Sequence, residues 1–505
     1  MKRLTPDILF ESGHLSQDLA RKSVRGGMTT MTAQGVQFVL QLAGTMVLAR
    51  LLTPNDYGLI GMVTVVVGFA GMFKDAGLSM ATVQRDSISH EQISTLFWLN
   101  VLLSAFLGLC VLAGSPLVAW FYGRPELTAV TAALSLSFII TGLTIQHAAL
   151  LRRHMRFATV AVIQIASYVI SLVVTILLAL AGWRYWALVG GSLATAVSGT
   201  LLTLFFCPWI PGRMQRGTGI RGMLKFGGHL TGFNFVNYFS RNADSILIGR
   251  FIGADALGLY ARAYQLFMLP ISQIKGPLDQ VAMPVLSSLR NQPDRYVKYY
   301  QRLLDIMASL TIPLTMYCIV EADFLIRLLL GPKWLGAVSV FRILAIAGLI
   351  QPLFATAGLV QISHGYSQRF FYWGIVGAFV YVSAFALGIP FGIEAVAAFY
   401  TIANYVMFVP TLLYCFHKTP VTVFLFMRTL AAPLIISSAA VATATVIGQT
   451  LVGSWSGTHL VFACAYAGVI FGAYCLRTSV RETMGLICRA SSRRGPKATL
   501  VPEVS

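Results

Sequence analysis

The sequence Arg50-Leu51-Leu52, followed by Tyr57-Gly58-Leu59, returns 200 residues later as Arg250-Phe251-Ile252, followed by Leu257-Gly258-Leu259. No gap is needed between the two stretches. Each match is short and carries little weight alone, but the matches keep their order and their offset. This pattern indicates that the second half of the chain is a copy of the first.

Later segments of the chain extend the repeat with slightly larger shifts. Arg156-Phe157 resembles Arg369-Phe370, each just before an apolar segment, and Trp186-Ala187-Leu188-Val189 resembles Glu394-Ala395-Val396-Ala397. A repeat of this length predicts two lobes with the same architecture.

Composition places both copies in a membrane. Of the 505 residues, 56% are hydrophobic and only 11% are charged, and the mean hydropathy is +0.73. Soluble domains have about 25% charged residues, so this chain cannot cover a water-facing surface, and it is too apolar to be disordered. A spanning helix needs about 20 mostly apolar residues, and the chain holds about fourteen such segments. They are 29–51, 57–73, 95–117, 127–147, 159–181, 185–206, 226–248, 257–282, 303–320, 337–360, 371–389, 393–415, 422–447 and 458–476.

The predicted fold class is therefore an all-α polytopic membrane protein made of two six-helix lobes and two further C-terminal helices. An even number of spans per repeat gives both lobes the same orientation, so their pseudo-twofold axis runs along the membrane normal. The expected divisions are a cytoplasmic N-terminal segment, an N-lobe, a basic linker, a C-lobe, the last helix pair and a basic tail. Their ranges are 1–27, 28–206, 207–225, 226–415, 416–476 and 477–505.

The charge of +19, from 37 Lys and Arg against 18 Asp and Glu, is a topology signal. Cytoplasmic loops are enriched in Lys and Arg, and most basic residues fall on one side when the N-terminus is placed inside. Both termini are then expected in the cytoplasm, with the basic loops near anionic membrane lipid. This placement excludes a nucleic-acid partner. The N-terminal segment lacks the apolar core of a signal peptide, and the seven cysteines have no metal-binding spacing, so no metal or cofactor is expected.

Two repeat-related segments carry polar stripes with helical spacing. The stripe of the first segment is Gln34, Gln37, Gln41 and Thr45, and that of the seventh is Asn234, Asn237, Arg241 and Ser245, each 200 positions later. A polar stripe facing lipid is costly, so it faces a water-filled cavity or forms hydrogen bonds between helices. Both alternatives stay open from the sequence.

Charged residues within the seventh and eighth segments point to a site in the C-lobe. Arg241 and Asp244 are three apart, and Lys275 and Asp279 are four apart, so each pair can neutralise itself. Arg262 has no acidic residue three or four positions away, although Gln265 follows it. A guanidinium can donate two parallel hydrogen bonds to a phosphate. Arg262 is therefore the best candidate for an anionic substrate group.

These residues lie within motifs that resemble a known family. The first motif resembles the signature of Wzx-type polysaccharide transporters, which belong to the multidrug/oligosaccharidyl-lipid/polysaccharide superfamily. It comprises Arg241-Asn242-Ala243-Asp244, Leu247-Ile248-Gly249-Arg250-Phe251-Ile252-Gly253 and Leu257-Gly258-Leu259-Tyr260-Ala261-Arg262-Ala263-Tyr264-Gln265-Leu266. Leu48-Ala49-Arg50-Leu51-Leu52-Thr53-Pro54 resembles the family's first-loop motif, and Arg152-Arg153-His154-Met155-Arg156-Phe157 resembles its fourth cytoplasmic-loop motif. The likeness is strongest to colanic-acid and succinoglycan exporters.

The resemblance implies a flippase of the bacterial inner membrane and not an enzyme. Such transporters move undecaprenyl-pyrophosphate-linked oligosaccharide repeat units to the outer leaflet for exopolysaccharide or lipopolysaccharide biosynthesis. The implied partners are the lipid-linked substrate, membrane lipids, a polysaccharide polymerase and a chain-length regulator, with proton or sodium as coupling ion. Related lipid flippases hold arginines in a central cavity, with one on the eighth helix, a role that Arg262 fits.

The expected site follows from these assignments. Arg241 and Arg262 would meet the pyrophosphate, and the sugars would lie along the polar stripes, with Asp244 or Asp279 carrying a coupling ion. The substrate-binding candidates are Gln34, Gln37, Gln41, Asn234, Asn237, Arg241, Arg262 and Gln265.

Two rival functions stay open at this stage. A multidrug or cation antiporter of the same superfamily would favour acidic residues in its cavity, whereas this one is basic. A membrane polymerase or glycosyltransferase would need an acid/base constellation. The longest outer loop offers Glu321 and Asp323, with no histidine beside them in the sequence.

Overall fold

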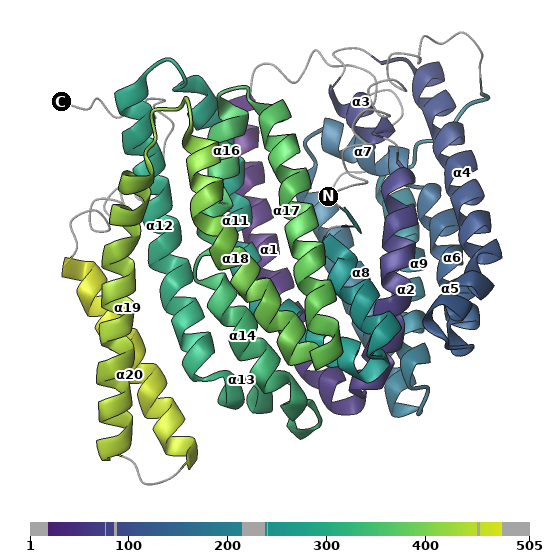
Figure 1. Cartoon of the computed structure of the whole chain (residues 1–505). Helices are drawn as coiled ribbons and strands as arrows, with labels where there is room; N and C mark the ends of the chain where they lie inside the picture. Colours follow the sequence, from purple (N-terminus) through teal and green to yellow (C-terminus); the bar gives the residue numbers. More distant parts are fainter. Residues whose placement is uncertain are drawn as a thin grey trace. The chain divides into compact units, whose positions relative to one another are not determined.

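A computed structural model of the chain describes residues 19–75, 77–84, 88–214, 238–239, 241–451 and 455–476. Every regular element in these ranges is an α-helix or a short 3-10 helix (Figure 1). The packing divides the chain into two compact units. The first holds Met1–Gln273, Leu325–Leu344 and Phe371–Met407, and the second holds Ile274–Phe324, Ala345–Phe370 and Phe408–Ser505.

The first unit contains the N-terminal helices. They are α1 (Leu19–Leu51), α2 (Pro54–Phe73), α3 (Leu78–Gln84), α4 (His90–Ala113), α5 (Ser115–Tyr122), α6 (Glu126–Gly142), α7 (Ile145–Arg153), α8 (Phe157–Leu180) and α9 (Tyr185–Phe206). Helix α8 packs against α1 and α9, and α6 packs against α4 and α9. Capping boxes start two of these helices, Thr53 with Asp56 before α2 and Ser89 with Gln92 before α4.

Later segments complete the first unit. Residues 241–251 are helical, and α11 (Ala254–Ser288) follows them and continues into the second unit after Gln273. Helices α13 (Ala322–Leu329), α14 (Val338–Gly348), α17 (Ser367–Gly388) and α18 (Ile393–Phe416) are likewise shared between the units, and the 3-10 helices η3 (Pro332–Ala337) and η4 (Ile389–Phe391) belong to the first.

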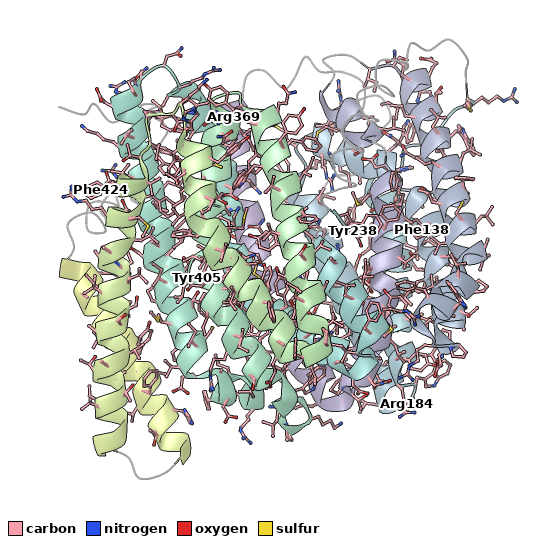
Figure 2. All side chains as sticks on the ribbon, viewed as in Figure 1. Phe138, Arg184, Tyr238, Arg369, Tyr405 and Phe424 are labelled. Carbon is pink, nitrogen blue, oxygen red and sulfur yellow. The ribbon has the colours of Figure 1, made fainter. Side chains whose placement is uncertain are left out.

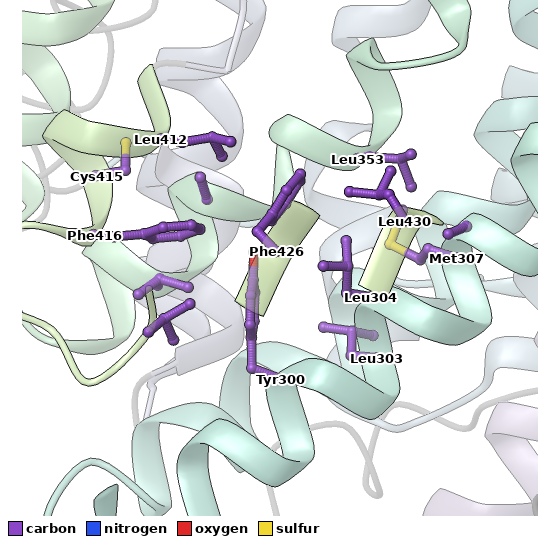
Figure 3. Close-up of a cluster of buried hydrophobic side chains, with 14 of the residues drawn as sticks. Tyr300, Leu303, Leu304, Met307, Leu353, Leu412, Cys415, Phe416, Phe426 and Leu430 are labelled. Carbon is purple, nitrogen blue, oxygen red and sulfur yellow. The ribbon is translucent and has the colours of Figure 1, made fainter. Parts of the chain in front are cut away.

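The second unit is built round an apolar core. Its own helices are α12 (Pro293–Val320), α15 (Gln351–Phe354), α16 (Thr356–Ser363), α19 (Val423–Leu451) and α20 (Trp455–Leu476). Figure 3 shows part of the core, in which Tyr300 and Leu304 of α12 meet Phe416 of α18 and Phe426 of α19. Helix α19 packs against α12 and α20 (Figure 1). The last helix pair is therefore attached to the second unit through α12.

Helices of this length and composition make the chain a multi-pass membrane protein. Within the described residues, 9 helices are long and apolar enough to cross a membrane, or up to 10 if the bent pair α6 and α7 counts as one span. The predicted fold class is thus confirmed, whereas the number fourteen is not. Helices α1 and α11 lie where spans were predicted but carry many polar residues, and most of the predicted seventh span, 226–248, lies outside the described residues.

Two of the arginines mark helix ends. Figure 2 shows Arg184 at the connection between α8 and α9, and Arg369 near the start of α17. Apolar side chains are exposed both near a helix end, as Phe424 at the start of α19 (Figure 2), and in mid-helix, as Phe379 on α17, at 75% and 76%. An exposed phenylalanine on a helix of this kind is suited to contact with lipid.

The repeat is visible as a symmetric contact between the starts of α2 and α11. A Cβ atom at Gly58 would lie 1.8 Å from the carbonyl oxygen of Ala254, and one at Gly258 would lie 1.9 Å from that of Pro54. In the same place the Asn55 amide donates a hydrogen bond to the Asp255 carboxylate at 2.9 Å. All three pairs follow the 200-residue offset, so the two helix starts cross about a local twofold axis, and each glycine is needed for the backbones to approach.

A second repeated detail lies at the helix corner that precedes α8 and α17. The Nδ1 atom of His154 lies 2.9 Å from the carbonyl oxygen of Leu150, and that of His364 lies 2.9 Å from that of Val360. The next residue has a positive φ in both corners, 53° at Met155 and 80° at Gly365. The same turn therefore recurs at an offset of 210, which is larger than 200 as the sequence predicts but three residues short of the match between Arg156-Phe157 and Arg369-Phe370.

Candidate substrate-binding site

The guanidinium of Arg262 lies on α11, two turns from its start, over the ring of Tyr57 on α2. Its Cζ atom is 3.6 Å from the ring centroid, and its Nη1 donates to Gln265 Oε1 at 2.6 Å. A cation stacked on an aromatic face in this way gains about 0.5–2 kcal/mol. Among the described residues no carboxylate pairs with Arg262, whose electrostatic partners are the phenols of Tyr57 and Tyr168. The charge is therefore positioned but not neutralised.

Tyr57 is held in place from its other side. The ring packs edge-on against Trp334, with centroids 5.5 Å apart, and the indole of Trp334 donates to the carbonyl oxygen of Ala49 at 2.8 Å. Trp334 is fully buried, and Tyr57 is 7% exposed. The end of α1, the start of α2 and η3 thus form a rigid support under Arg262.

Helix α8 contributes a second phenol within electrostatic range of Arg262. The half-buried Tyr168 interacts electrostatically with Arg262 and with Tyr57. Its hydroxyl lies 2.9 Å from the position that a Cβ atom would take at Gly44 of α1. Helices α1, α2, α8 and α11 therefore converge at one place, and Gly44 leaves the space that the Tyr168 hydroxyl needs.

The polar stripe of α1 lies on a partly accessible face. Gln34, Gln37 and Gln41 are each half-buried, and among the described residues none of their amides has a hydrogen-bond partner. The expected partners across the repeat, Asn234 and Asn237, lie outside the described residues. The choice between a cavity and hydrogen bonds between helices therefore stays a prediction.

Arg241 and Asp244 are separate in the structure. Arg241 is exposed, and Asp244 is buried, 8% exposed, without an ion pair between them. The Asp244 carboxylate accepts from the backbone N–H of Ser245 at 2.6 Å and interacts electrostatically with Tyr260, which is also buried. Self-neutralisation of this pair, which the spacing allowed, does not occur. Asp244 is a buried acid among phenols, whereas Arg241 is not among the groups that interact with Arg262.

Lys275 and Asp279 do form the ion pair that their spacing allows. Both side chains belong to the second unit, and each is about a quarter to a third exposed, at 32% for Lys275 and 25% for Asp279. Asp279 thus has a cation beside it, which Asp244 lacks. Of the two candidates for binding a coupling ion, Asp279 is therefore already in an ion pair and Asp244, within the described residues, is not.

Glu321 has a histidine partner that is distant from it in the sequence. Glu321 has no histidine near it along the chain, but the fold places Nδ1 of His459 2.5 Å from its carboxylate. The imidazole also stacks on Phe324 with ring centroids 4.7 Å apart. The pair joins α20 to the end of α12, which is a packing role that the linear sequence conceals.

Tyr57, Tyr168 and Trp334 were missed by reasoning from the sequence. Aromatic residues are common in membrane helices, so their type gave no signal. Tyr57 lies within a quoted repeat motif, where its counterpart is Leu257, and this mismatch was the one available clue.

A family model and several bacterial proteins match more than half of the chain. Residues 47–339 match the family model described as "Polysaccharide biosynthesis protein". The teichuronic acid biosynthesis protein TuaB of Bacillus subtilis is 29% identical over 66% of this chain and 70% of its own length. The lipopolysaccharide biosynthesis protein WzxC of Escherichia coli is 24% identical over 78% and 82%. The succinoglycan biosynthesis transport protein ExoT of Rhizobium meliloti is 24% identical over 72% and 73%.

Solved structures share the fold. The lipid II flippase MurJ, in an inward closed conformation, superposes with a TM-score of 0.70 at 13% identity and covers 91% of this chain and 100% of its own. An inward-facing multidrug resistance transporter of the MATE family, in the MOP superfamily, gives 0.59 at 16% identity, covering 80% and 100%. At these identities the likeness concerns architecture, and it agrees with the predicted fold class.

Proposed function

We propose, since the chain belongs to the polysaccharide biosynthesis protein family, that it moves lipid-linked oligosaccharides across a membrane. The substrate we infer is the undecaprenyl-pyrophosphate-linked repeat unit of an exopolysaccharide or lipopolysaccharide. It would pass from the inner to the outer leaflet of the bacterial cytoplasmic membrane. The observation that carries the proposal is Arg262, a positioned guanidinium inside a bundle of membrane helices that has no carboxylate partner among the described residues.

The position of Arg262 supports contact with a substrate phosphate. It lies about 12 Å along α11 from the helix start, at 1.5 Å per residue, and hence within the membrane part of the chain. A charge there costs about 2.5–3.5 kcal/mol on the insertion scale. No carboxylate among the described residues pairs with this charge. An anionic group of the substrate would therefore offset the cost of keeping it in the membrane. The planar fork suits phosphate oxygens.

The sugars would bind along the polar stripe of α1. Gln34, Gln37 and Gln41 lie on one face of that helix, and an amide can both donate to and accept from a hydroxyl. Asn234 and Asn237 are proposed to supply the matching face from the second repeat, and Arg241 a second cation at the pyrophosphate. The polyprenyl chain would stay in lipid.

Transport would proceed by alternating access between an N-lobe, 28–206, and a C-lobe, 226–415. With both termini cytoplasmic, α2 and α11 begin on the outer side, where the Gly58 and Gly258 contact joins the two repeats. Opening to the outside would then require this contact to separate. A polymerase and a chain-length regulator are the proposed consumers of the exported unit.

Asp244 is the better of the two candidates for ion coupling. It is buried, and no basic residue in the described ranges pairs with it, so a proton or a sodium ion would neutralise it, whereas Asp279 already faces Lys275. A multidrug antiporter is less well supported, because a cationic drug would be repelled by an unpaired arginine.

The test is complementation of a bacterial strain that lacks its polysaccharide flippase. Arg262→Ala should abolish polymer export at normal protein level, and Arg241→Ala should reduce it. Arg250→Ala is the matched control, because Arg250 is exposed at a helix end and stacks on Phe121, outside the site. If Arg262→Ala and Arg241→Ala both export polymer normally, the cationic site is wrong.

A further inference from the structure

We propose that the hydroxyl groups of Tyr57 and Tyr168 bind the same phosphate group as Arg262 and complete a three-donor subsite for a pyrophosphate. This inference rests on the proposed function and names the residues that recognise the anionic part of the substrate. Neither tyrosine was predicted from the sequence, and they come from different helices, α2 and α8.

Tyr57 has a buried hydroxyl without a partner. The side chain is 7% exposed, and in the described part of the chain no hydrogen bond reaches its hydroxyl oxygen. The ring itself is held twice, by Arg262 over its face at 3.6 Å and by Trp334 at its edge at 5.5 Å. Buried polar groups are almost always hydrogen-bonded, so this hydroxyl is free to donate to a ligand or a water. The ring is fixed by packing, and its hydroxyl is left to donate to whatever meets Arg262.

Tyr168 approaches the same place from α8. It interacts electrostatically with both Arg262 and Tyr57, and it is half-buried. The Cβ-free Gly44 admits its hydroxyl between α1 and α8, since a Cβ atom there would be 2.9 Å from the oxygen. The hydroxyl therefore lies against α1, within the range at which it interacts electrostatically with Arg262. A neutral phenol donates one hydrogen bond, so two phenols and a guanidinium give a set of donors without an acid.

The chemistry of this set selects a phosphate over a sugar. A sugar hydroxyl could also bond to these groups, since a phenol both donates and accepts, but a neutral partner gains less from the charge of Arg262 than an anion does. A phosphate or a diphosphate accepts from every group in the set. The repeat-related positions of Tyr57 and Arg262 are Leu257 and Met62, so only one such subsite exists in the two repeats at these positions.

The experiment measures binding to the full-length protein in nanodiscs of neutral phosphatidylcholine. The probe is undecaprenyl pyrophosphate, with inorganic pyrophosphate and phosphatidylglycerol as competitors. The variants are Tyr57→Phe and Tyr168→Phe, which keep the ring and remove the hydroxyl, with Arg262→Ala as reference. Tyr122→Phe is the matched control, because Tyr122 is also 7% exposed and does not interact with Arg262. A thermal melt of each variant checks folding, and the unpartnered hydroxyl of Tyr57 predicts no loss of stability.

We expect Tyr57→Phe and Tyr168→Phe each to weaken binding about tenfold, the usual effect of one hydrogen bond to a charged group. Tyr122→Phe should bind normally, and inorganic pyrophosphate should compete. Normal binding by both phenylalanine variants, with binding lost in Arg262→Ala, overturns this inference and leaves the proposed function standing. Normal binding by all three variants would also contradict the proposal that Arg262 binds the phosphate. Competition by phosphatidylglycerol but not by inorganic pyrophosphate overturns the inference in favour of a bulk lipid headgroup.

Discussion

The first turns of α2 and α11 are repeat-related, and they keep the same backbone while differing in chemistry. Gly58 and Gly258 let each helix start touch the other at a carbonyl oxygen. Beyond that point Met62 of α2 corresponds to Arg262 of α11. Met62 is fully buried, whereas Arg262 stacks on Tyr57. The duplicated architecture is therefore symmetric where helices cross and asymmetric where a substrate would bind.

The same difference appears one helix earlier. Asp244 lies at the position that Gly44 holds in the first repeat. Gly44 gives room to the Tyr168 hydroxyl, and Asp244 is a buried acid beside Tyr260. The first repeat thus supplies Gly44 and the aromatic rings, and the second supplies the charged side chains of Asp244 and Arg262.

Alanine at either contact glycine should have the largest effect. The new Cβ would lie under 2 Å from a backbone oxygen that cannot move without its helix. We expect Gly58→Ala and Gly258→Ala to lower the free energy of unfolding by a similar amount, about 3 kcal/mol, seen as a lower Tm in detergent. Gly71→Ala, in the same helix with nothing within 4 Å of its Cβ, is the control. Unequal effects of the two substitutions would contradict the symmetry.

Replacing Arg262 by the residue of the other repeat removes the asymmetry directly. Arg262→Met should fold normally, because Met62 fills the related position, and should weaken binding of undecaprenyl pyrophosphate about tenfold to a hundredfold through lost charged hydrogen bonds. The measurement is a titration in nanodiscs together with a melting curve. Binding equal to that of the parent protein would show that the charge difference has no part in recognition.

Asp244→Asn tests the second charge. The amide keeps the shape of the carboxyl and its acceptor for the Ser245 N–H, but it cannot bind and release a proton or hold a cation. Transport into proteoliposomes driven by a proton or sodium gradient should fall about tenfold, while binding without a gradient stays unchanged. Asp279→Asn is the comparison, since its partner is Lys275. Equal losses in both variants would argue against a special role for Asp244.

The smallest effect is expected at the Asn55 and Asp255 pair. Asn55→Ala removes one hydrogen bond of 2.9 Å at the crossing of the two helices, so the free energy of unfolding should fall by about 0.5–1.5 kcal/mol. Transport should be unchanged or slightly faster if separation of this contact opens the outer side. Slower transport at an unchanged Tm would place the pair in the transport site and not in the contact.

Reasoning from residues located the helices better than it located the site. Apolar runs such as those of α8 and α9 were identified with their ends within a few residues, because a membrane helix must show about 20 apolar residues in order. Amphipathic helices such as α12 were identified only in their apolar part, since the first turns carry Asp294 and Arg295. The bend of 44° between α6 and α7 falls inside the predicted span 127–147 and was not predicted.

The sequence by itself determined the membrane class, the duplication and the choice of Arg262, because composition, offset and unpaired charge are properties of the linear chain. Only the tertiary structure decided what surrounds Arg262. Tyr57 and Tyr168 are distant in sequence from Arg262, and helices from both repeats must pack before their hydroxyls and the guanidinium share one space. Likewise Glu321 met His459 only through the docking of α20. Contacts between distant helices depend on packing geometry, which one chain's pattern of residue types does not contain.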